Sequence, residues 1–381
     1  MKKILFLLPS LATGGLERVQ VTLANALAKN GHDVTVLALE PADDLRCDLD
    51  TRVHYRYKPY KAHPIGGKLP YIRYKFYDDG MWETRASAKT LYEYYIGNEQ
   101  FDVEIAFFRG LPIKIVSGSS NPNSVKLAWV HSDFRLARGY QNNFTSLDAV
   151  RAAYTSFDKI VCISGEAKKG FVEAIGDTKN LAVIYDPLPI EHIRSLGEKK
   201  LATPTRKSAF HLVLVARLLD NTKGQCRLVS VVKRLRDEGF DLSLTLVGGG
   251  PDEKKIRKAI EDAGLADFVT LAGNQKNPYP YIKEADLLVC ASYFEGYNLT
   301  VAEALILGVP VLSTRCAGPV EILDGGEYGR IAENTDESLY ENLKDLLRHP
   351  EELATYRTLA SERIAFFDDM ETAKKVEALF S

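Results

Sequence analysis

Cysteine is scarce in this 381-residue sequence, and no two cysteines stand in a C-x-x-C spacing. The five that are present lie far apart, at Cys47, Cys162, Cys226, Cys290 and Cys316. This pattern excludes a disulfide-rich scaffold and a zinc or redox site built on a cysteine pair. Three of them lie in or directly after apolar strand-like runs, where a thiol packs as a small hydrophobic group. We therefore expect reduced thiols and a cytoplasmic protein.

Long apolar runs are also missing, because no stretch reaches the ~18 residues that a membrane-spanning helix requires. The start, MKKILFLLPSLATGG, has two lysines before an apolar run, as a signal peptide does. Pro9 interrupts this run, and a helical pattern and a second strand-like run follow it. A first β-strand over residues 4–8 explains the segment better.

Neither sign of charge is in excess, since 49 Lys and Arg face 51 Asp and Glu for a net charge of −2. A nucleic-acid-binding protein normally has a strong basic excess, so this partner is disfavoured. Residues 52–77 differ from the rest, because they combine many Lys, Arg and Tyr residues with no acid. Such a segment suits peripheral contact with an anionic membrane or with a pyrophosphate-bearing acceptor, although a solvated surface explains it equally.

Short apolar runs alternate with helical patterns over almost the whole chain, which predicts parallel sheets with crossover helices. The predicted strands cover residues 4–8, 33–39, 103–107, 126–130, 159–163 and 181–185, and then 211–215, 242–247, 268–271, 287–290 and 309–312. At ~150 residues per domain, the length predicts two domains. Prolines and charges at residues 187–207 predict a linker between them. We thus expect two doubly wound Rossmann-like domains, residues 1–190 and 205–365, facing across a cleft.

The segment SYFEGYNLTVAEALILGVPVL carries two acids, Glu295 and Glu303, beyond the predicted strand at residues 287–290. Glu303 falls in a helix that is apolar almost all round and that Asn298 can cap, so its carboxylate is expected to be buried. A buried carboxylate requires partners. A ligand with two adjacent hydroxyls, such as a ribose, satisfies it, and so does a neighbouring backbone group or the helix dipole.

Arg217 and Lys223 follow the strand predicted at residues 211–215 and come just before a helix. Two cations at the ligand side of a strand end suit a diphosphate, the guanidinium as a fork and the ammonium as a point charge. Two solvated surface charges are the alternative.

Glycines follow two predicted strands, Gly14 and Gly15 after the first and residues 248–250, with Gly249 in the middle, after a later one. They allow close approach of a nucleotide or phosphate, or they simply make turns. The segment around Gly14 lacks G-x-G-x-x-G, which weakens a dinucleotide site, although Glu40 at the end of the second strand keeps a dehydrogenase open.

His131 and the weaker candidate Arg109 follow two other strands of the first half. A lone histidine at such a place is more often structural than catalytic. His131 is nevertheless positioned to hydrogen-bond a substrate or to stabilise developing charge.

Five segments in this order together resemble glycosyltransferase family 4, retaining enzymes of the GT-B fold. They are TGGLERV, WVH at residues 129–131, VARLLDNTKG, VGGGP and FEGYNLTVAEALILGVPV. The resemblance covers nearly the whole chain and implies that a C-terminal helix, about residues 368–381, crosses back to the first domain. It also implies that the first domain binds the acceptor and the second the donor. The chain departs from many relatives in reading YDPLP, with Asp186 before the proline.

The same resemblance assigns roles to residues. Glu303 would hold the donor ribose, and Arg217 with Lys223 the donor diphosphate. Glu295 and the amides of Gly296, Tyr297 and Asn298 would hold the transferred sugar, with Gly14, Gly249 and Leu299 in the same donor-binding set. Gly15 would approach the phosphate or the reacting centre, and His131 would contact the sugar, so that the catalytic residues would be His131, Glu295 and Gly15.

The expected activity is transfer of a hexose or N-acetylhexosamine, with retention, from a nucleotide diphosphate sugar, most readily a UDP-sugar. The acceptor would be a glycan or a polyprenyl-diphosphate-linked glycan of capsule, exopolysaccharide or lipopolysaccharide synthesis, at the inner face of the cytoplasmic membrane. No cofactor or metal is expected, because two fixed cations serve the diphosphate and no D-x-D suited to a metal-bound donor lies near a strand end. A GT-B nucleotide-sugar epimerase and a non-catalytic two-lobed sugar-binding module remain as alternatives.

Overall fold

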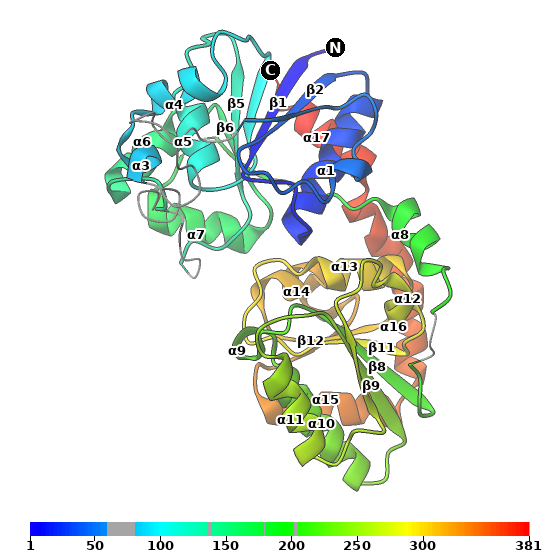
Figure 1. Cartoon of the computed structure of the whole chain (residues 1–381). Helices are drawn as coiled ribbons and strands as arrows, with labels where there is room; N and C mark the ends of the chain where they lie inside the picture. Colours follow the sequence, from blue (N-terminus) through cyan, green and yellow to red (C-terminus); the bar gives the residue numbers. More distant parts are fainter. Residues whose placement is uncertain (59–80, 136–138, 140, 179, 202–204, 381) are drawn as a thin grey trace, which may run out of the picture. The chain divides into compact units, whose positions relative to one another are not determined.

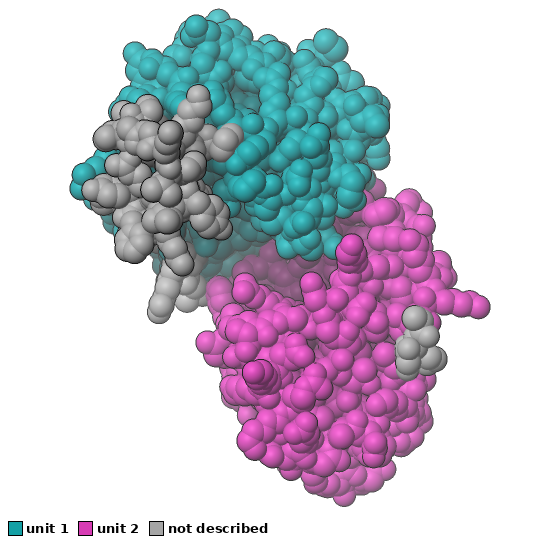
Figure 2. All heavy atoms as spheres, in the orientation of Figure 1, with its two compact units in different colours: residues 1–187, 369–381 teal, residues 188–368 magenta. Residues whose placement is uncertain are grey.

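The computed structural model describes residues 1–58, 81–135, 139, 141–178, 180–201 and 205–380 (Figure 1). The chain divides into two compact units, coloured separately in Figure 2. Unit 1 contains residues 1–187 and 369–381, and unit 2 contains residues 188–368. Each unit has a parallel sheet of its own.

Unit 1 has a seven-stranded parallel sheet in the order β3-β2-β1-β4-β5-β6-β7. Its strands are β1 (Lys3–Leu8), β2 (Asp33–Ala38), β3 (His54–Tyr57), β4 (Val103–Ala106), β5 (Val125–Val130), β6 (Lys159–Cys162) and β7 (Leu181–Val183). Its helices are α1 (Gly15–Lys29), α3 (Met81–Arg85), α4 (Ala88–Tyr95), α5 (Leu111–Ser117), α6 (Leu147–Thr155), α7 (Gly165–Ile175) and α17 (Asp369–Glu377), with a 3-10 turn η1 (Arg46–Asp48). The central strands are buried almost throughout, as near-continuous apolar runs in a covered parallel sheet require.

Unit 2 has a six-stranded parallel sheet in the order β10-β9-β8-β11-β12-β13. Its strands are β8 (Phe210–Val215), β9 (Leu242–Val247), β10 (Val269–Gly273), β11 (Leu287–Cys290), β12 (Val311–Thr314) and β13 (Arg330–Ala332). Its helices are α8 (Ile190–Gly197), α9 (Asp220–Lys223), α10 (Gln225–Asp237), α11 (Glu253–Asp262), α12 (Tyr279–Lys283), α13 (Leu299–Ile306), α14 (Ala317–Ile322), α15 (Asp336–Arg348) and α16 (Glu351–Arg363), with 3-10 turns η2 (Asp324–Gly326) and η3 (Ile364–Phe367). One apolar core joins strands β8, β9, β11 and β12 to the buried faces of α10, α11 and α15.

The C-terminal helix α17 returns to unit 1 and packs against α1, as the fold resemblance implied (Figure 1). Glu377 accepts a hydrogen bond of 2.7 Å from the amide of Asn30, and the ring of Phe380 meets that of His32 edge to face at 5.7 Å. Both chain crossings between the units lie side by side, because Leu188 pairs with Asp368 and its amide donates to the carbonyl of Phe367. The predicted doubly wound fold is thus confirmed.

One predicted linker contains a helix, and two strands of the structure were not predicted. The prolines and charges of residues 187–207 predicted only a linker, but helix α8 lies there and packs against α12 and α13 of unit 2. Strands β3 and β13 were not predicted, because β3 is a mostly exposed edge strand of sequence HYRY and β13 has three residues. Within the described part of the chain, no helix combines the length and the apolar composition that crossing a bilayer requires.

Candidate functional site

The site of unit 2 lies where the strand order of its sheet reverses, between β8 and β11. From β8 the chain adds β9 and β10 on one side and then β11, β12 and β13 on the other. The loops that leave the carboxyl ends of two such strands diverge and open a crevice, which is the usual ligand site of doubly wound sheets. Arg217 and Lys223 follow β8, and Glu295 follows β11. Topology thus brings together three of the predicted donor residues.

Lys223 and Glu295 form an ion pair across this point. The Lys223 ammonium donates to both oxygens of Glu295, at 2.7 Å to Oε1 and 2.8 Å to Oε2. Glu295 is buried, and Lys223 is about one-quarter exposed. The cavity next to the pair measures only about 10 Å³, so this pair fills the space beside β8 and β11.

Two further donors reach the buried carboxylate of Glu295. The Ser292 hydroxyl donates to Oε1 at 2.6 Å, and the side-chain amide of Asn298 donates to the same oxygen at 3.1 Å. From the described residues Oε1 therefore accepts three hydrogen bonds, whereas Oε2 accepts only that of Lys223. Asn298 stands at the N-cap position of α13 with a left-handed φ of 73°, but its side chain makes no capping hydrogen bond. It donates instead to Glu295 and to the Cys290 sulfur, so the prediction that it caps the helix is wrong.

The loop between β11 and α13 leaves two backbone amides open. Among the described residues, no hydrogen bond involves the backbone N–H of Gly296 or that of Asn298. Tyr297 between them is buried, and Leu299 is the first residue of α13. Free amides at the start of a helix favour an anion or a polar oxygen.

Gly224 allows Lys223 to reach this loop. It joins α9 to α10 with a left-handed φ of 65°, and a Cβ there would lie 2.2 Å from the carbonyl oxygen of Ala291. Only glycine accepts both constraints at low cost. Asp220 at the start of α9 is fixed in turn, because it accepts from the Cys226 amide at 2.7 Å and from Lys255 at 2.6 Å.

Arg217 is exposed, and its guanidinium has no hydrogen bond or ion pair with any described residue. Its loop packs against the glycine loop after β9: a Cβ at Gly248 would lie 2.0 Å from the carbonyl oxygen of Ala216, and one at Gly250 would lie 2.3 Å from that of Leu218. Packing therefore requires two of the three glycines, which favours the interpretation that they make a turn. Gly249 has more room, 3.3 Å to the Cβ of Asn274.

Glu303 is buried in α13, and its carboxylate is hydrogen-bonded. The hydroxyl of Tyr279 donates to Oε1 at 3.1 Å. Tyr279 begins α12, and its amide in turn donates to Asn277. Helix α12 thus contacts, through Tyr279, the acid predicted to hold the ribose. Nothing in the sequence signalled this pairing, since 24 residues separate the partners.

In unit 1, Gly14 and Gly15 begin α1 directly after the loop of β1, at the carboxyl edge of the sheet. Glu17 in the first turn lies so close that a Cβ at Gly14 would meet its carboxylate at 2.1 Å. Burial raises the pKa of Glu17, while a backbone hydrogen bond and the charge of His131 act to lower it. Sequence reasoning missed Glu17, which reads there as an ordinary acid in a helix's first turn.

His131 follows β5 at the same edge, and its ring is held by the protein. Nε2 lies 2.8 Å from the carbonyl oxygen of Phe107, and Nδ1 lies 3.6 Å from Oδ1 of Asp186. Arg109 donates to the Ser132 hydroxyl at 3.0 Å. The structure thus gathers the candidates of unit 1 at one edge, but both ring nitrogens of His131 face protein groups.

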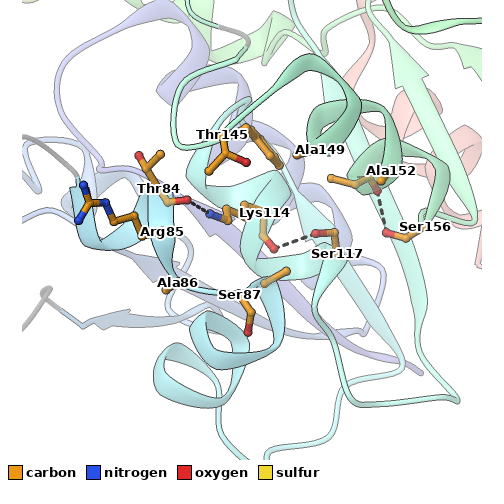
Figure 3. A pocket seen from close by; sticks show the side chains of 13 residues that line it. Thr84, Arg85, Ala86, Ser87, Lys114, Ser117, Thr145, Ala149, Ala152 and Ser156 are labelled. Carbon is orange, nitrogen blue, oxygen red and sulfur yellow. Dashed lines mark hydrogen bonds between the residues drawn. The ribbon is translucent and has the colours of Figure 1, made fainter.

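A separate hollow of about 390 Å³ lies among α3, α4, α5 and α6 of unit 1 (Figure 3). It contains none of the predicted site residues. Lys114 at its base donates to the carbonyl oxygens of Glu83, Thr84 and Asn143, at 2.6 to 2.9 Å. All three ammonium hydrogens are used, so Lys114 fixes the end of α3 rather than offering a free cation.

Two family models match the chain in sequence. The one described as Glycosyltransferase Family 4 matches residues 13–192, and the one described as Glycosyl transferases group 1 matches residues 209–349. Together they cover both units.

Relatives of known sequence match over nearly the whole length. An uncharacterized glycosyltransferase of Haemophilus influenzae is 27% identical over 92% of each chain. The N-acetylgalactosamine-N,N'-diacetylbacillosaminyl-diphospho-undecaprenol 4-alpha-N-acetylgalactosaminyltransferase of Campylobacter jejuni is 24% identical over 98% of each.

Among solved structures, HepE of Anabaena in complex with UDP superposes with a TM-score of 0.76 at 19% identity, over 99% of this chain and 98% of that one. The likeness shows that the two units form the GT-B fold. With both units matched by family models and with glycosyltransferases as relatives along its length, the chain belongs to glycosyltransferase family 4.

Proposed function

We propose that this protein is a retaining glycosyltransferase that moves a hexose or N-acetylhexosamine from a UDP-sugar to a glycan or a polyprenyl-diphosphate-linked glycan. The observation that carries the proposal is the pairing of Lys223 with Glu295 at the strand-order reversal of unit 2. A cation for the phosphates and an acid for the sugar stand there side by side, which is what a sugar diphosphate presents to its site.

The pair retains hydrogen-bonding capacity for a donor. An ammonium has three hydrogens, and Lys223 gives two of them to Glu295, so the third is free for a phosphate oxygen. Oε2 of Glu295 accepts only from Lys223, and a carboxylate oxygen can accept twice. A sugar hydroxyl then donates to Oε2. Arg217, whose guanidinium is not paired with any described residue, supplies the second positive charge for the diphosphate.

Two cations, Arg217 and Lys223, take the role that a metal has in other nucleotide-sugar enzymes, and we propose that no metal is required. In the reaction, the bond between the anomeric carbon and the donor phosphate oxygen breaks, and the diphosphate leaves as an anion stabilised by Arg217 and Lys223. The acceptor hydroxyl forms the new bond on the same face of the sugar and gives its proton to the departing phosphate oxygen. Atoms and charge balance without a protein nucleophile.

The carboxylate of Glu303 is proposed to accept hydrogen bonds from the two hydroxyls of the donor ribose. The Tyr279 hydroxyl keeps the buried carboxylate oriented, and α12, which begins at Tyr279, would then border the base. The choice of uridine is supported by HepE, whose structures hold UDP and, in another crystal, UDP-glucose.

The acceptor class and the cell setting are proposed from the relatives. The name of the Campylobacter jejuni enzyme states a diphospho-undecaprenol-linked acceptor, and another relative, from Rhizobium meliloti, is a lipopolysaccharide core biosynthesis glycosyltransferase. We therefore propose work at the inner face of the cytoplasmic membrane, in surface polysaccharide synthesis.

Peripheral membrane contact through residues 52–77 is part of this proposal, but most of that segment lies outside the described residues. Of its described cations, Arg52 pairs with Asp50 and Arg56 with Glu99, and Lys58 donates to the carbonyl of Tyr94. The test is binding to vesicles that contain anionic lipid, with and without removal of the charges at Lys61, Arg73 and Lys75. Loss of binding on charge removal would show that the segment contacts the membrane.

The deciding experiment for the donor is a thermal-shift panel with UDP, GDP and ADP and their glucose conjugates. We expect the uridine ligands to raise Tm of the wild type clearly and that of Glu303→Gln little. Glu261→Gln, an exposed acid in the same unit, is the matched control and should respond as the wild type does. Equal shifts in all three proteins would remove Glu303 from the site.

Two product assays test the chemistry. The anomeric proton coupling of the product, measured by NMR, should show the donor's configuration, and inversion would contradict the mechanism. Turnover should persist in excess EDTA. Arg217→Ala should lower kcat/KM on the order of 100-fold, with Arg348→Ala, an exposed arginine late in α15, as control.

A further inference from the structure

His131 and Asp186 face each other at the carboxyl edge of the unit 1 sheet, although neither the site prediction nor the mechanism above gives Asp186 a role. His131 follows β5, and Asp186 follows β7. Nδ1 of His131 lies 3.6 Å from Oδ1 of Asp186, and the side chains are 6% and 1% exposed. Both groups are thus largely removed from solvent.

The other ring nitrogen defines where one proton of His131 is. Nε2 lies 2.8 Å from the carbonyl oxygen of Phe107. A carbonyl oxygen can only accept a hydrogen bond, so Nε2 carries a hydrogen and donates it. Nδ1 is therefore the nitrogen whose protonation is open, and it is the one that faces the carboxyl group.

The atoms on the Asp186 side are buried without a partner. Neither Oδ1 nor Oδ2 of Asp186, nor Nδ1 of His131, has a hydrogen bond to any described residue. A neutral ring would place a lone pair against a buried carboxylate, and both acceptors would stay unsatisfied. An unpaired buried charge of this kind costs several kcal/mol, so a proton between the two atoms is strongly favoured.

Two aromatic rings, an acid and an arginine are the other groups described around this ring. The rings of Phe107 and Phe108 lie 4.7 and 5.9 Å from it and restrict solvent. Glu17 of α1 is the other acid that interacts with His131, and burial raises the pKa of Glu17 itself. Arg109, which follows β4, donates to the hydroxyl of Ser132, the residue after His131.

We infer that Asp186 is a positioning residue that keeps His131 doubly protonated, with a proton on Nδ1 and the facing carboxylate as its counter-charge. The proton resides on the ring because imidazole is intrinsically the stronger base of the two. This inference rests on the proposed function for its consequence: His131 offers no ring nitrogen as a general base and instead presents a fixed positive charge to an anionic donor.

The ring itself can be observed without any substrate. Long-range ¹H–¹⁵N NMR of the ligand-free, ¹⁵N-histidine-labelled protein distinguishes a doubly protonated ring from a neutral tautomer, and His131→Gln assigns the signal among the seven histidines. At pH 8 we expect both nitrogens of His131 to carry protons. A neutral His131 ring at pH 8 would overturn the inference.

Asp186→Asn supplies the matched change, because it keeps the shape and removes the charge. Its amide can donate to Nδ1, so His131 should become the neutral tautomer with its hydrogen on Nε2. Retention of the doubly protonated ring in this variant would also overturn the inference. If the variant fails to fold, the spectrum of the wild type decides alone.

Kinetics then test the role of the charge. We expect Asp186→Asn to lower kcat on the order of tenfold and to change KM for the donor little, and an unchanged kcat would overturn the positioning role. Absence of transfer by the wild type would count against the proposed function only, since the NMR result does not depend on turnover.

Discussion

Lys223 and Glu295, 72 residues apart, meet in unit 2 with the ammonium 2.7 and 2.8 Å from the two carboxylate oxygens. Each was predicted to bind a different part of a donor, but in the structure each is first a partner of the other. The pairing supplies the cation that the buried Glu295 carboxylate needs, since a buried acid without a cation is costly.

Removing one partner should therefore cost more than removing both. Lys223→Gln leaves the Glu295 carboxylate with Ser292 and Asn298 alone, and we expect a loss of about 2 kcal/mol in the free energy of unfolding. The double variant with Glu295→Gln should recover at least half of it. Urea unfolding measures the cycle, with exposed Lys254→Gln as control. Simple additivity of the two single variants would refute the coupling.

The fold was predictable because its signals are local or periodic. Alternating strand-like and helical patterns identified β1, β9 and β11 with bounds that agree within a residue. The edge strand β3 was not predicted because its residues are mostly exposed and its apolar and polar residues alternate only weakly. Helix α8 was not predicted because three prolines in the surrounding segment indicated a linker. Helix α8 is stabilised by packing on α12 and α13, which no local signal encodes.

The site was predictable in membership but not in pairing. Strand ends locate Arg217, Lys223, Glu295 and His131, because parallel strands present their carboxyl ends at one edge. The contacts of Tyr279 with Glu303 and of His131 with Asp186 join distant segments, so spacing carries no trace of them. The cap prediction for Asn298 rested on a local sequence rule. It failed because the Asn298 side-chain amide donates to the nearby Glu295 carboxylate and not to the helix.

Gly224 should be intolerant of any side chain. In Gly224→Ala the new Cβ would lie 2.2 Å from the carbonyl oxygen of Ala291, in addition to the strain of a φ of 65°. We expect a loss of about 3 kcal/mol or more in unfolding free energy. UDP affinity should also fall, because the clash moves α9 and with it Lys223.

Gly264→Ala separates the two causes of this loss. Gly264 has nearly the same φ, 67°, but nothing lies within 4 Å of a Cβ there. It should therefore show only the conformational strain, about 1 kcal/mol, and normal UDP binding. Equal effects at both positions would show that the contact with Ala291 is unimportant.

His211 should make unit 2 less stable in mild acid. It is fully buried in β8 beside the hydroxyls of Ser243 and Thr245, and burial lowers its pKa to about 4. The folded state therefore keeps the ring neutral, whereas the unfolded chain takes up a proton below about pH 6.5. The stability present above pH 6.5 is lost as the pH falls towards 4, by about 3 kcal/mol in all.

The measurement is the difference in unfolding free energy between the wild type and His211→Gln at pH 7 and at pH 4.5. Carboxylates titrate in the same range in both proteins, so only the difference reports His211. The wild type should lose its advantage at the lower pH. His192→Gln, at an exposed position of α8, is the control. A constant difference for His211→Gln would contradict the assignment.

Thiol reactivity should follow burial in the folded chain, and it tests both units at once. Cys47 is exposed, while Cys162, Cys290 and Cys316 are buried. Burial raises the pKa of Cys162 to about 12 and those of Cys226 and Cys316 to about 11, so few of these thiols are thiolates at pH 8.

A chromogenic disulfide reagent should label one thiol rapidly. Cys47→Ser should abolish that rapid phase, and the other thiols should react only on unfolding. Because Cys290 and Cys316 lie beside Ser292 and Glu295, their rapid labelling in the native protein would mean that the crevice at β11 opens without a ligand.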